Sequence, residues 1–257
     1  MNVSRRLLAV LLPAALVAGC GGSAGSGHPG TSGGSSARPS TSAPTGIPGC
    51  APECLSGISD PGTLKAGPYR TAHFLNGLLT LDLKGEWESH EDQPVEFSLA
   101  PQGNWDVHRV LFWSDIIPVG KNGKPAAGVP HTTAGMLAWL RTRQNVKVSA
   151  PRSDTIGTRS LPAEVVDIEV ARDAVNEATD CPVRACADFL TWPNAGENVY
   201  GIAEPAVLRL YLSDIGYGGS RHLLAVGVEG QSPADLKDFL PTAEQLIADA
   251  DAPVSSF

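Results

Sequence analysis

The sequence has few basic residues and no long apolar run. Its 257 residues include 19 Lys and Arg against 27 Asp and Glu, a formal net charge of −8. Nucleic acids and anionic lipid surfaces are bound through basic surfaces, so this balance argues against both as direct partners. The apolar stretch from Leu7 to Val17 would span about 16 Å as a helix, short of the roughly 30 Å hydrocarbon core of a bilayer. We therefore expect no permanent transmembrane helix from it.

The N-terminus has the three parts of an export signal. Arg5 and Arg6 form a basic region, Leu7 to Val17 an apolar region, and Ala18-Gly19 supplies the small residues before a cleavage site. The sequence Val17-Ala18-Gly19-Cys20 resembles the lipobox of bacterial lipoproteins. That resemblance predicts that residues 1–19 are removed and that acyl chains such as palmitate on Cys20 anchor the protein to the extracytoplasmic face of the cell membrane. Multiple chains make a stable anchor. The alternative is an ordinary secreted protein in which Cys20 occurs by chance.

The segment that follows the lipobox, residues 20–46, is predicted to be a disordered tether. It consists almost entirely of Gly, Ser, Thr, Pro and Ala, with hardly any residue able to enter a core. Such a segment cannot offset the entropy lost on ordering. As a flexible chain of about 26 residues it has an end-to-end distance of roughly 28 Å, enough to hold a folded domain clear of the lipid headgroups.

Four cysteines remain once Cys20 is assigned to lipid. Cys50 and Cys54 are four residues apart, and Cys181 and Cys186 are five apart. An even number in an exported chain predicts disulfides, and the two local pairs are the simplest of three connectivities. Free or cross-paired thiols are a second alternative. A four-cysteine zinc site is a third, but these spacings are wider than the usual two-residue knuckles. The CxxC spacing of redox enzymes is absent.

Alternating apolar and polar residues predict antiparallel strands after residue 69. Leu79, Leu81 and Leu83 alternate with polar residues, and Asn76-Gly77 before them is a strong hairpin signal. Further strands are expected at 95–99, 108–113, 166–170, 208–212 and 224–228, the last after a turn at 216–219. Half-polar strands favour an antiparallel sheet with one covered face.

Two helices are also predicted. Thr132 or Thr133 is the expected N-cap of a helix that runs through Leu140, and Ser232 with Asp235 forms the capping pattern of a second. Pro241 is expected to kink or split the second helix. The fold class expected is therefore α+β, an antiparallel sheet flanked by helices. We expect a single domain over 69–257, preceded by a disulfide-tied lead-in at 47–68.

Several segments between Tyr69 and Ala250 resemble a broad group of actinobacterial extracytoplasmic lipoproteins. The segments are Tyr69–Gly85 followed by Glu86-Trp87, Val129–Leu140, Leu161-Pro162-Ala163, Arg209–Tyr211 and Gly218–Val226. Sequences of this group are similar to the PsbP-like domain, and the resemblance implies an α/β/α sandwich. PsbP-like proteins serve mainly in scaffolding and assembly and share no catalytic constellation. The resemblance therefore implies no catalytic residue, cofactor or metal ligand.

Two clusters of polar residues are candidates for chemical sites. The acidic stretch from Glu86 to Asp92 has the oxygen ligands of a calcium site but neither the spacing nor the internal glycine of a known loop, so we interpret it as a solvated rim. Ser220 and His222, or His131, with Asp214 or Asp167, would supply a catalytic triad. Ser220 follows Gly218-Gly219 in what is most simply a hairpin turn, so we expect no hydrolase.

The sequence thus predicts a lipid-anchored, non-catalytic binding or assembly module whose partner is an unknown protein. A partly exposed Trp105 or Trp192 is a candidate for its binding surface. The alternative is a carrier that encloses an apolar, lipid-like ligand beneath the sheet. An apolar cavity of several hundred Å³ would favour the carrier.

Overall fold

The structure is a computed structural model that describes residues 54–55, 62–120, 123–171, 181, 183, 185–196 and 198–257. The elements of the first half are β1 (Cys54–Leu55), β2 (Gly62–Leu64), β3 (Gly67–Thr71), the 3-10 helix η1 (Phe74–Gly77), β4 (Thr80–Leu83), β5 (Trp87–Gln93), β6 (Glu96–Pro101), β7 (Arg109–Ser114) and β8 (Ile117–Pro118). The second half has α1 (Thr133–Thr142), β9 (Val146–Val148), β10 (Arg152–Ile156), β11 (Leu161–Val170), β12 (Cys186–Thr191), β13 (Tyr200–Ala203), β14 (Val207–Tyr217), β15 (Ser220–Gly230), α2 (Pro233–Asp249) and β16 (Ser255–Ser256).

An antiparallel sheet of ten strands forms the centre of the domain. Its main path runs β10-β11-β14-β15-β7-β6-β5-β2, with β9 paired to β11 and β16 paired to β14. The hairpin of β14 and β15 is its longest pairing, from Val207 opposite Gly230 to Tyr217 opposite Ser220. Two smaller sheets, β1-β3-β4 and β13-β12-β8, complete the strands.

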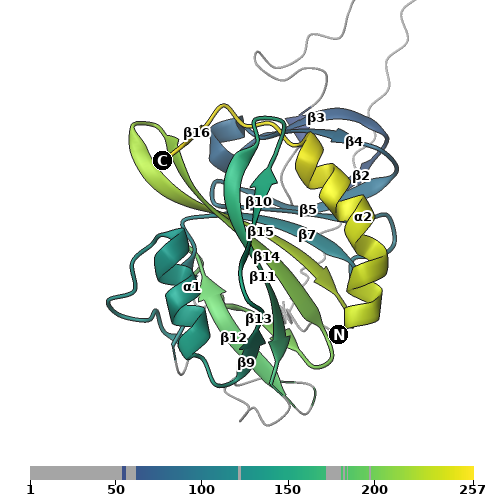
Figure 1. Cartoon of the computed structure of the whole chain (residues 1–257). Coiled ribbons are helices and arrows are strands. Elements are labelled where there is room, and N and C mark those ends of the chain that lie inside the picture. The colour runs from purple at the N-terminus through teal and green to yellow at the C-terminus, as the bar shows by residue number, and fades with distance from the viewer. Residues whose placement is uncertain are drawn as a thin grey trace, which may run out of the picture. The chain divides into compact units, whose positions relative to one another are not determined.

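Both faces of the central sheet are buried. On β7, Val110 and Phe112 enter one core, whereas Leu111 and Trp113 enter a second core on the opposite face. The first core lies between the sheet and β3, β4, η1 and α2; the second lies between the sheet, α1, β12 and β13. Figure 1 shows α1 and α2 on opposite sides of the β14–β15 hairpin. Since burial of a large apolar side chain contributes about 1.5–3 kcal/mol, both layers stabilise the sheet.

The predicted helix-flanked α/β/α sandwich is wrong. The described residues form sixteen strands and two α-helices, and the strands are mostly antiparallel. Short strands cover much of each face that the prediction assigned to helices. Strand β4 was predicted from its alternation, but β8, β12 and β13 on the other face were not. Strand β8 has only two residues, and neither β12 nor β13 alternates apolar with polar residues.

The predicted helix starts are confirmed. Thr132 accepts a hydrogen bond from the Gly135 N–H of α1 at 3.1 Å. At α2, Ser232 accepts from the Asp235 N–H at 3.1 Å, and the Asp235 carboxylate accepts from the Gln231 N–H at 2.7 Å. The helix α2 continues through Pro241 to Asp249, so Pro241 does not split it.

The predicted hairpin at Asn76-Gly77 is only partly confirmed. Strands β3 and β4 pair antiparallel, but the connection is longer than two residues and contains η1. Leu75 and Asn76 both adopt left-handed backbone angles, with φ of 49° and 57°. A bulky side chain such as Leu disfavours this region, so the segment must be held by its surroundings.

Candidate functional site

A groove lies between the tip of the β14–β15 hairpin and the C-terminal segment. Gly218 and Gly219 form the tip with φ of 61° and 79°, which glycine adopts without steric cost. Strand β16 pairs with β14 at Ile215 and Gly216. A Cβ atom on Gly216 would lie 2.9 Å from the Phe257 ring and 2.9 Å from the Ser255 hydroxyl oxygen, so a larger residue here would force these side chains to shift.

The groove is open and has a volume of about 500 Å³. It is lined by Arg159, residues 216–220, residues 253–255 and Phe257. Phe257 is 69% exposed, so its ring lies at the surface beside the groove. The lining thus combines two aromatic rings, hydroxyl groups and glycine backbone.

The cations beside the groove are paired. Arg159 Nε lies 2.8 Å from the Asp251 carboxylate, and an Arg221 guanidinium nitrogen lies 2.9 Å from the Asp214 carboxylate. Arg221 also lies over the Phe257 ring, 5.5 Å from its centroid. The groove therefore does not present an unpaired basic cluster to an anionic ligand.

The parts of the considered catalytic triad do not assemble. His222 Nδ1 lies 2.8 Å from a carboxylate oxygen of Asp115, which is neither of the two aspartates considered from the sequence. Asp214 instead accepts from the Thr133 N–H and pairs with Arg221. In the described part of the chain, no hydrogen bond joins Ser220 to His222. A serine without a base beside it is not an activated nucleophile.

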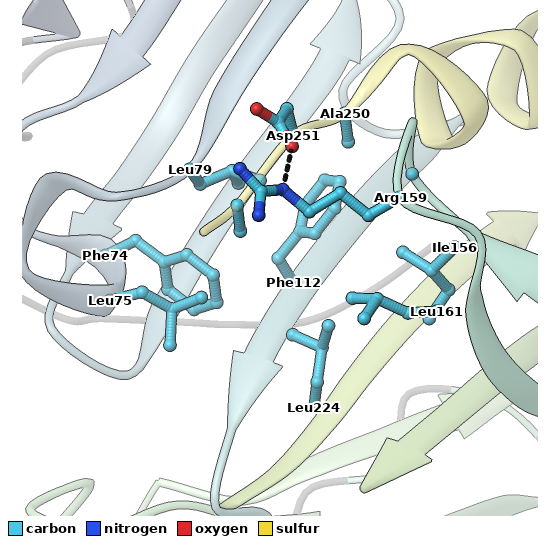
Figure 2. A pocket seen from close by; sticks show the side chains of 12 residues that line it. Phe74, Leu75, Leu79, Phe112, Ile156, Arg159, Leu161, Leu224, Ala250 and Asp251 are labelled. Carbon is cyan, nitrogen blue, oxygen red and sulfur yellow. Dashed lines mark hydrogen bonds and ion pairs between the residues drawn. The ribbon is translucent and has the colours of Figure 1, made fainter. Parts of the chain in front are cut away.

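The apolar cavity in the first core is small. It is lined mainly by apolar side chains, among them Phe74, Leu79, Phe112 and Leu224, and the Arg159–Asp251 ion pair lies at its rim (Figure 2). Its volume is about 20 Å³, roughly the space for one water molecule. An acyl chain does not fit into it.

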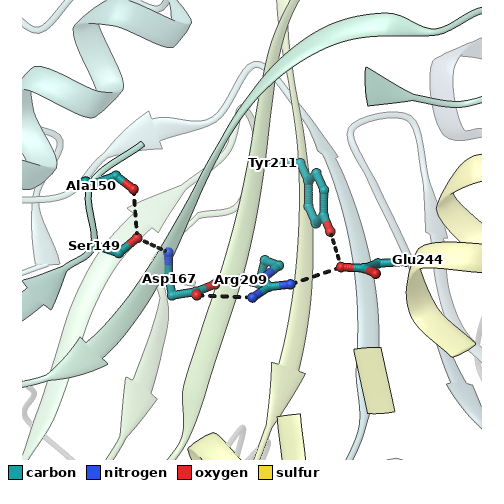
Figure 3. A network of polar contacts seen from close by, with 6 residues as sticks. All are labelled: Ser149, Ala150, Asp167, Arg209, Tyr211 and Glu244. Carbon is teal, nitrogen blue, oxygen red and sulfur yellow. Dashed lines mark hydrogen bonds and ion pairs between the residues drawn. The ribbon is translucent and has the colours of Figure 1, made fainter. Parts of the chain in front are cut away.

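Arg209 ties α2 to the sheet through two carboxylates (Figure 3). Its guanidinium donates to both oxygens of Asp167, at 2.8 and 3.2 Å, and to Glu244 at 2.9 Å. Burial lowers the pKa of Arg209, but the hydrogen bonds to Asp167 outweigh that effect and the net pKa is raised. The Tyr211 hydroxyl donates to Glu244, and burial together with that carboxylate raises the pKa of Tyr211 to about 12. Every group has a partner, so we interpret the network as structural.

A second polar network is buried around Glu229, near the C-terminal end of β15. The Arg109 guanidinium and the Tyr200 hydroxyl both donate to Glu229, the latter at 2.7 Å. Burial, followed by the Glu229 charge, raises the pKa of Tyr200 well above its ordinary value. Burial opposes the charge on Arg109, but Glu229 and Tyr200 outweigh it, and the Arg109 pKa is raised. The three side chains are paired with one another, so we interpret this network as structural too.

The tryptophans considered for binding have internal partners. Trp105 stacks on the His90 ring at 3.5 Å and lies under Arg109, whose guanidinium carbon is 5.2 Å from the ring centroid. Burial lowers the pKa of His90, and the neighbouring Glu88 only partly offsets this. Trp192 packs partly buried against the second core.

The acidic stretch interpreted as a solvated rim is strand β5, and its last carboxylate is internal. Asp92 is 1% exposed and accepts hydrogen bonds from the backbone N–H groups of Ala72, His73 and Phe74 at 2.6, 3.1 and 2.9 Å. The sequence carries no local sign of this role because the donors precede Asp92 by about 20 residues.

One predicted disulfide is present, since Cys181 and Cys186 are bonded, with their Cα atoms 5.7 Å apart. Cys20 and Cys50 lie outside the described residues, as do the predicted signal peptide and tether. Of Cys54 only the backbone is described, in β1.

No protein-family model and no curated protein matches the sequence. Within the described ranges, no group of three or more His, Cys, Asp and Glu is placed to hold a metal ion. None of the described helices is long and apolar enough to cross a membrane.

The groove was not predictable from the sequence. Tyr217, Arg159 and Phe257 come from three separate parts of the chain, and none belongs to a motif. The one local signal was the glycine-rich stretch 216–219, which was interpreted only as a turn. A glycine at 216, inside the strand, marks a close approach of another segment.

Proposed function

We propose that this protein is a non-catalytic binding module, anchored at the extracytoplasmic face of the cell membrane through lipidated Cys20, which holds a segment of a partner protein. The observation that carries the proposal is the open groove between the β14–β15 tip and the C-terminal segment, with Phe257 exposed at its edge. The partner that this lining suits is an extended polypeptide with an apolar or aromatic side chain.

The chemistry of the groove supports this choice of partner. Tyr217 and Phe257 contribute aromatic side chains to the lining, and aromatic residues are enriched where proteins bind each other. Gly218 and Gly219 are exposed and have no side chains to cover their peptide groups, so a partner backbone can approach closely. A volume of about 500 Å³ has room for a few residues.

The carrier alternative has less support. It needs an apolar cavity of several hundred Å³, and the apolar cavity in the first core has about 20 Å³. A non-catalytic role is proposed because Ser220 and His222, the nucleophile and base that the sequence offers, are not hydrogen-bonded to each other.

Photocrosslinking from within the groove tests the proposal. Phe257 replaced by benzoylphenylalanine should crosslink in cells to one discrete protein. The matched control is the same replacement at Lys237, an exposed residue of α2 outside the groove lining. Tyr217→Ala should abolish the crosslink from position 257. Equal crosslinking from both positions, or a crosslink that survives Tyr217→Ala, contradicts the groove as the binding site. Co-purified lipid in native mass spectra, without a protein, favours the carrier instead.

The anchor is tested separately. Cys20→Ala should move the full chain from the membrane fraction into the medium. Retention of the Cys20→Ala chain in the membrane fraction contradicts lipid anchoring, but it leaves the proposed groove unaffected.

A further inference from the structure

Strand β10 lies at the edge of the central sheet and is unusually exposed. Among the described strands it pairs with β11 alone. Arg152, Ser153, Asp154 and Thr155 are all exposed, and only Ile156 at its end is buried. An exposed edge strand offers unpaired peptide groups to another chain, so its side chains decide what can pair with it.

The hydrogen bonds of β10 show which peptide groups face outward. The Thr155 N–H donates to the Asp154 carboxylate at 2.8 Å. Opposite Thr155 on β11 is Pro162, which has no N–H to donate. The peptide groups of Thr155 therefore face away from β11. Because direction alternates along a strand, those of Ser153 face outward as well.

The charges on this edge have a two-fold pattern. Arg152 and Asp154 flank Ser153 and, two residues apart on a strand, share one face. Among the described residues, the Asp154 carboxylate accepts a hydrogen bond only from the Thr155 N–H, and Arg152 has no ion-pair partner. An antiparallel pair of such strands, centred on Ser153, places each Arg152 opposite an Asp154.

We propose that β10 pairs antiparallel with β10 of a second copy of this chain, about a two-fold axis at Ser153. The two Ser153 residues exchange a pair of N–H···O=C bonds. Each Thr155 N–H donates to the Pro151 carbonyl of the other copy, which releases Asp154 to pair with Arg152 of that copy. Opposite charges directly across an antiparallel pair stabilise it, and like charges destabilise it.

The same charges select the partner. Charged residues and Pro151 at an edge normally deter pairing with other strands. A strand that places a negative charge opposite Arg152 and a positive charge opposite Asp154 is the exception, because every charge then has an opposite charge across from it. The second copy of this chain meets that condition without any further segment. This inference does not depend on the proposed function of the groove.

Charge reversal tests the pairing on the full chain by sedimentation equilibrium up to millimolar concentration. Wild type should dimerise reversibly. Arg152→Asp and Asp154→Arg should each weaken the dimer by about tenfold or more, since each puts like charges opposite one another twice. An equimolar mixture of the two variants should form heterodimers, and the double variant should dimerise like wild type. Lys237→Asp is the control and should leave the dimer dissociation constant unchanged. A wild type that stays monomeric, or single variants that associate like wild type, overturns the proposal.

Two cysteine variants test the same pairing without changing the charges, in case a charge variant does not fold. Ser153→Cys should form a disulfide-linked dimer under mild oxidation, because residues opposite each other in a hydrogen-bonded pair have Cα atoms about 5.5 Å apart, within disulfide range. Thr155→Cys lies opposite Pro151 and should not. Equal crosslinking of both variants, or none from Ser153→Cys, contradicts the proposed register.

Discussion

Removing the Asp92 carboxylate should cost an unusually large share of the stability of the domain. This side chain is 1% exposed and accepts three backbone hydrogen bonds from the start of η1. It thereby holds a segment in which Leu75 and Asn76 have φ of 49° and 57°. Left-handed backbone angles are unfavourable for Leu, so contacts from outside η1 have to hold Leu75 in this conformation.

The magnitude follows from the three donors. In Asp92→Ala the buried Phe74 N–H loses its acceptor, at about 1–3 kcal/mol. Ala72 and His73 are nearer to solvent, and water partly replaces the lost bonds, so together they add about 1 kcal/mol. The vacated volume adds about another 1 kcal/mol. The expected loss is therefore about 3–5 kcal/mol. Asp92→Asn keeps one acceptor oxygen but places its NH₂ group, a donor, opposite a backbone N–H that is also a donor. We therefore expect this variant to lose about 2 kcal/mol of unfolding free energy.

Urea unfolding followed by tryptophan fluorescence measures these losses. The matched control is Glu86→Ala, which removes an exposed carboxylate just before the same strand and should stay within about 0.5 kcal/mol of wild type. The order of stability should be wild type, Asp92→Asn and then Asp92→Ala. An Asp92→Ala chain that unfolds at the same urea concentration as Glu86→Ala would refute the argument that this carboxylate holds η1.

Three further predictions concern charges. Tyr211 should ionise near pH 12, so the wild-type chain should show an absorbance increase at 295 nm near that pH that the Tyr211→Phe chain lacks. Because Tyr211 ionises more readily in the unfolded chain, the free energy of unfolding should fall as pH rises from 10 to 12. If Tyr211→Phe instead removes an absorbance change near pH 10, the prediction is contradicted. The folded-state pKa of His90 lies below its ordinary value, so the unfolded chain binds the proton first and stability falls as pH drops below about 6.5. His90→Asn should flatten that part of the pH profile, and an unchanged profile counts against it. Arg109→Met should cost about 3–5 kcal/mol in urea unfolding because it leaves Glu229 buried without its cation. The double variant Arg109→Met with Glu229→Gln should recover part of that loss, and simple addition of the two single losses contradicts the pairing.

The helix starts were predictable because their causes are local. The Ser232 hydroxyl and the Asp235 N–H are three residues apart, and so are Thr132 and Gly135. Side chains that cap a helix act within its first turn, so the sequence of that turn suffices to recognise them. The alternation of Leu79, Leu81 and Leu83 predicted β4 for the same reason.

Local sequence patterns did not predict which elements cover the two faces of the central sheet. Strand β7 has apolar residues on both faces, which shows burial but not whether a helix or a strand covers each face. The small sheets that cover them depend on pairings between distant segments, as between Ile117 on β8 and Thr191 on β12. No periodicity within one segment reports on such a pairing.

The features of the candidate site were also predictable where their causes are local and not predictable where they are long-range. The sequence alone determined the tight turn at Gly218-Gly219, the caps of both helices and the alternation of several strands, because neighbouring residues settle each of them. Tertiary structure alone decided that Asp92 is internal, that His222 meets Asp115 from 107 positions away, and that Arg159, Tyr217 and Phe257 surround one groove. The physical reason is that a carboxylate or an aromatic ring acquires its role from whatever the fold packs against it, and those neighbours are set by long-range pairing of strands.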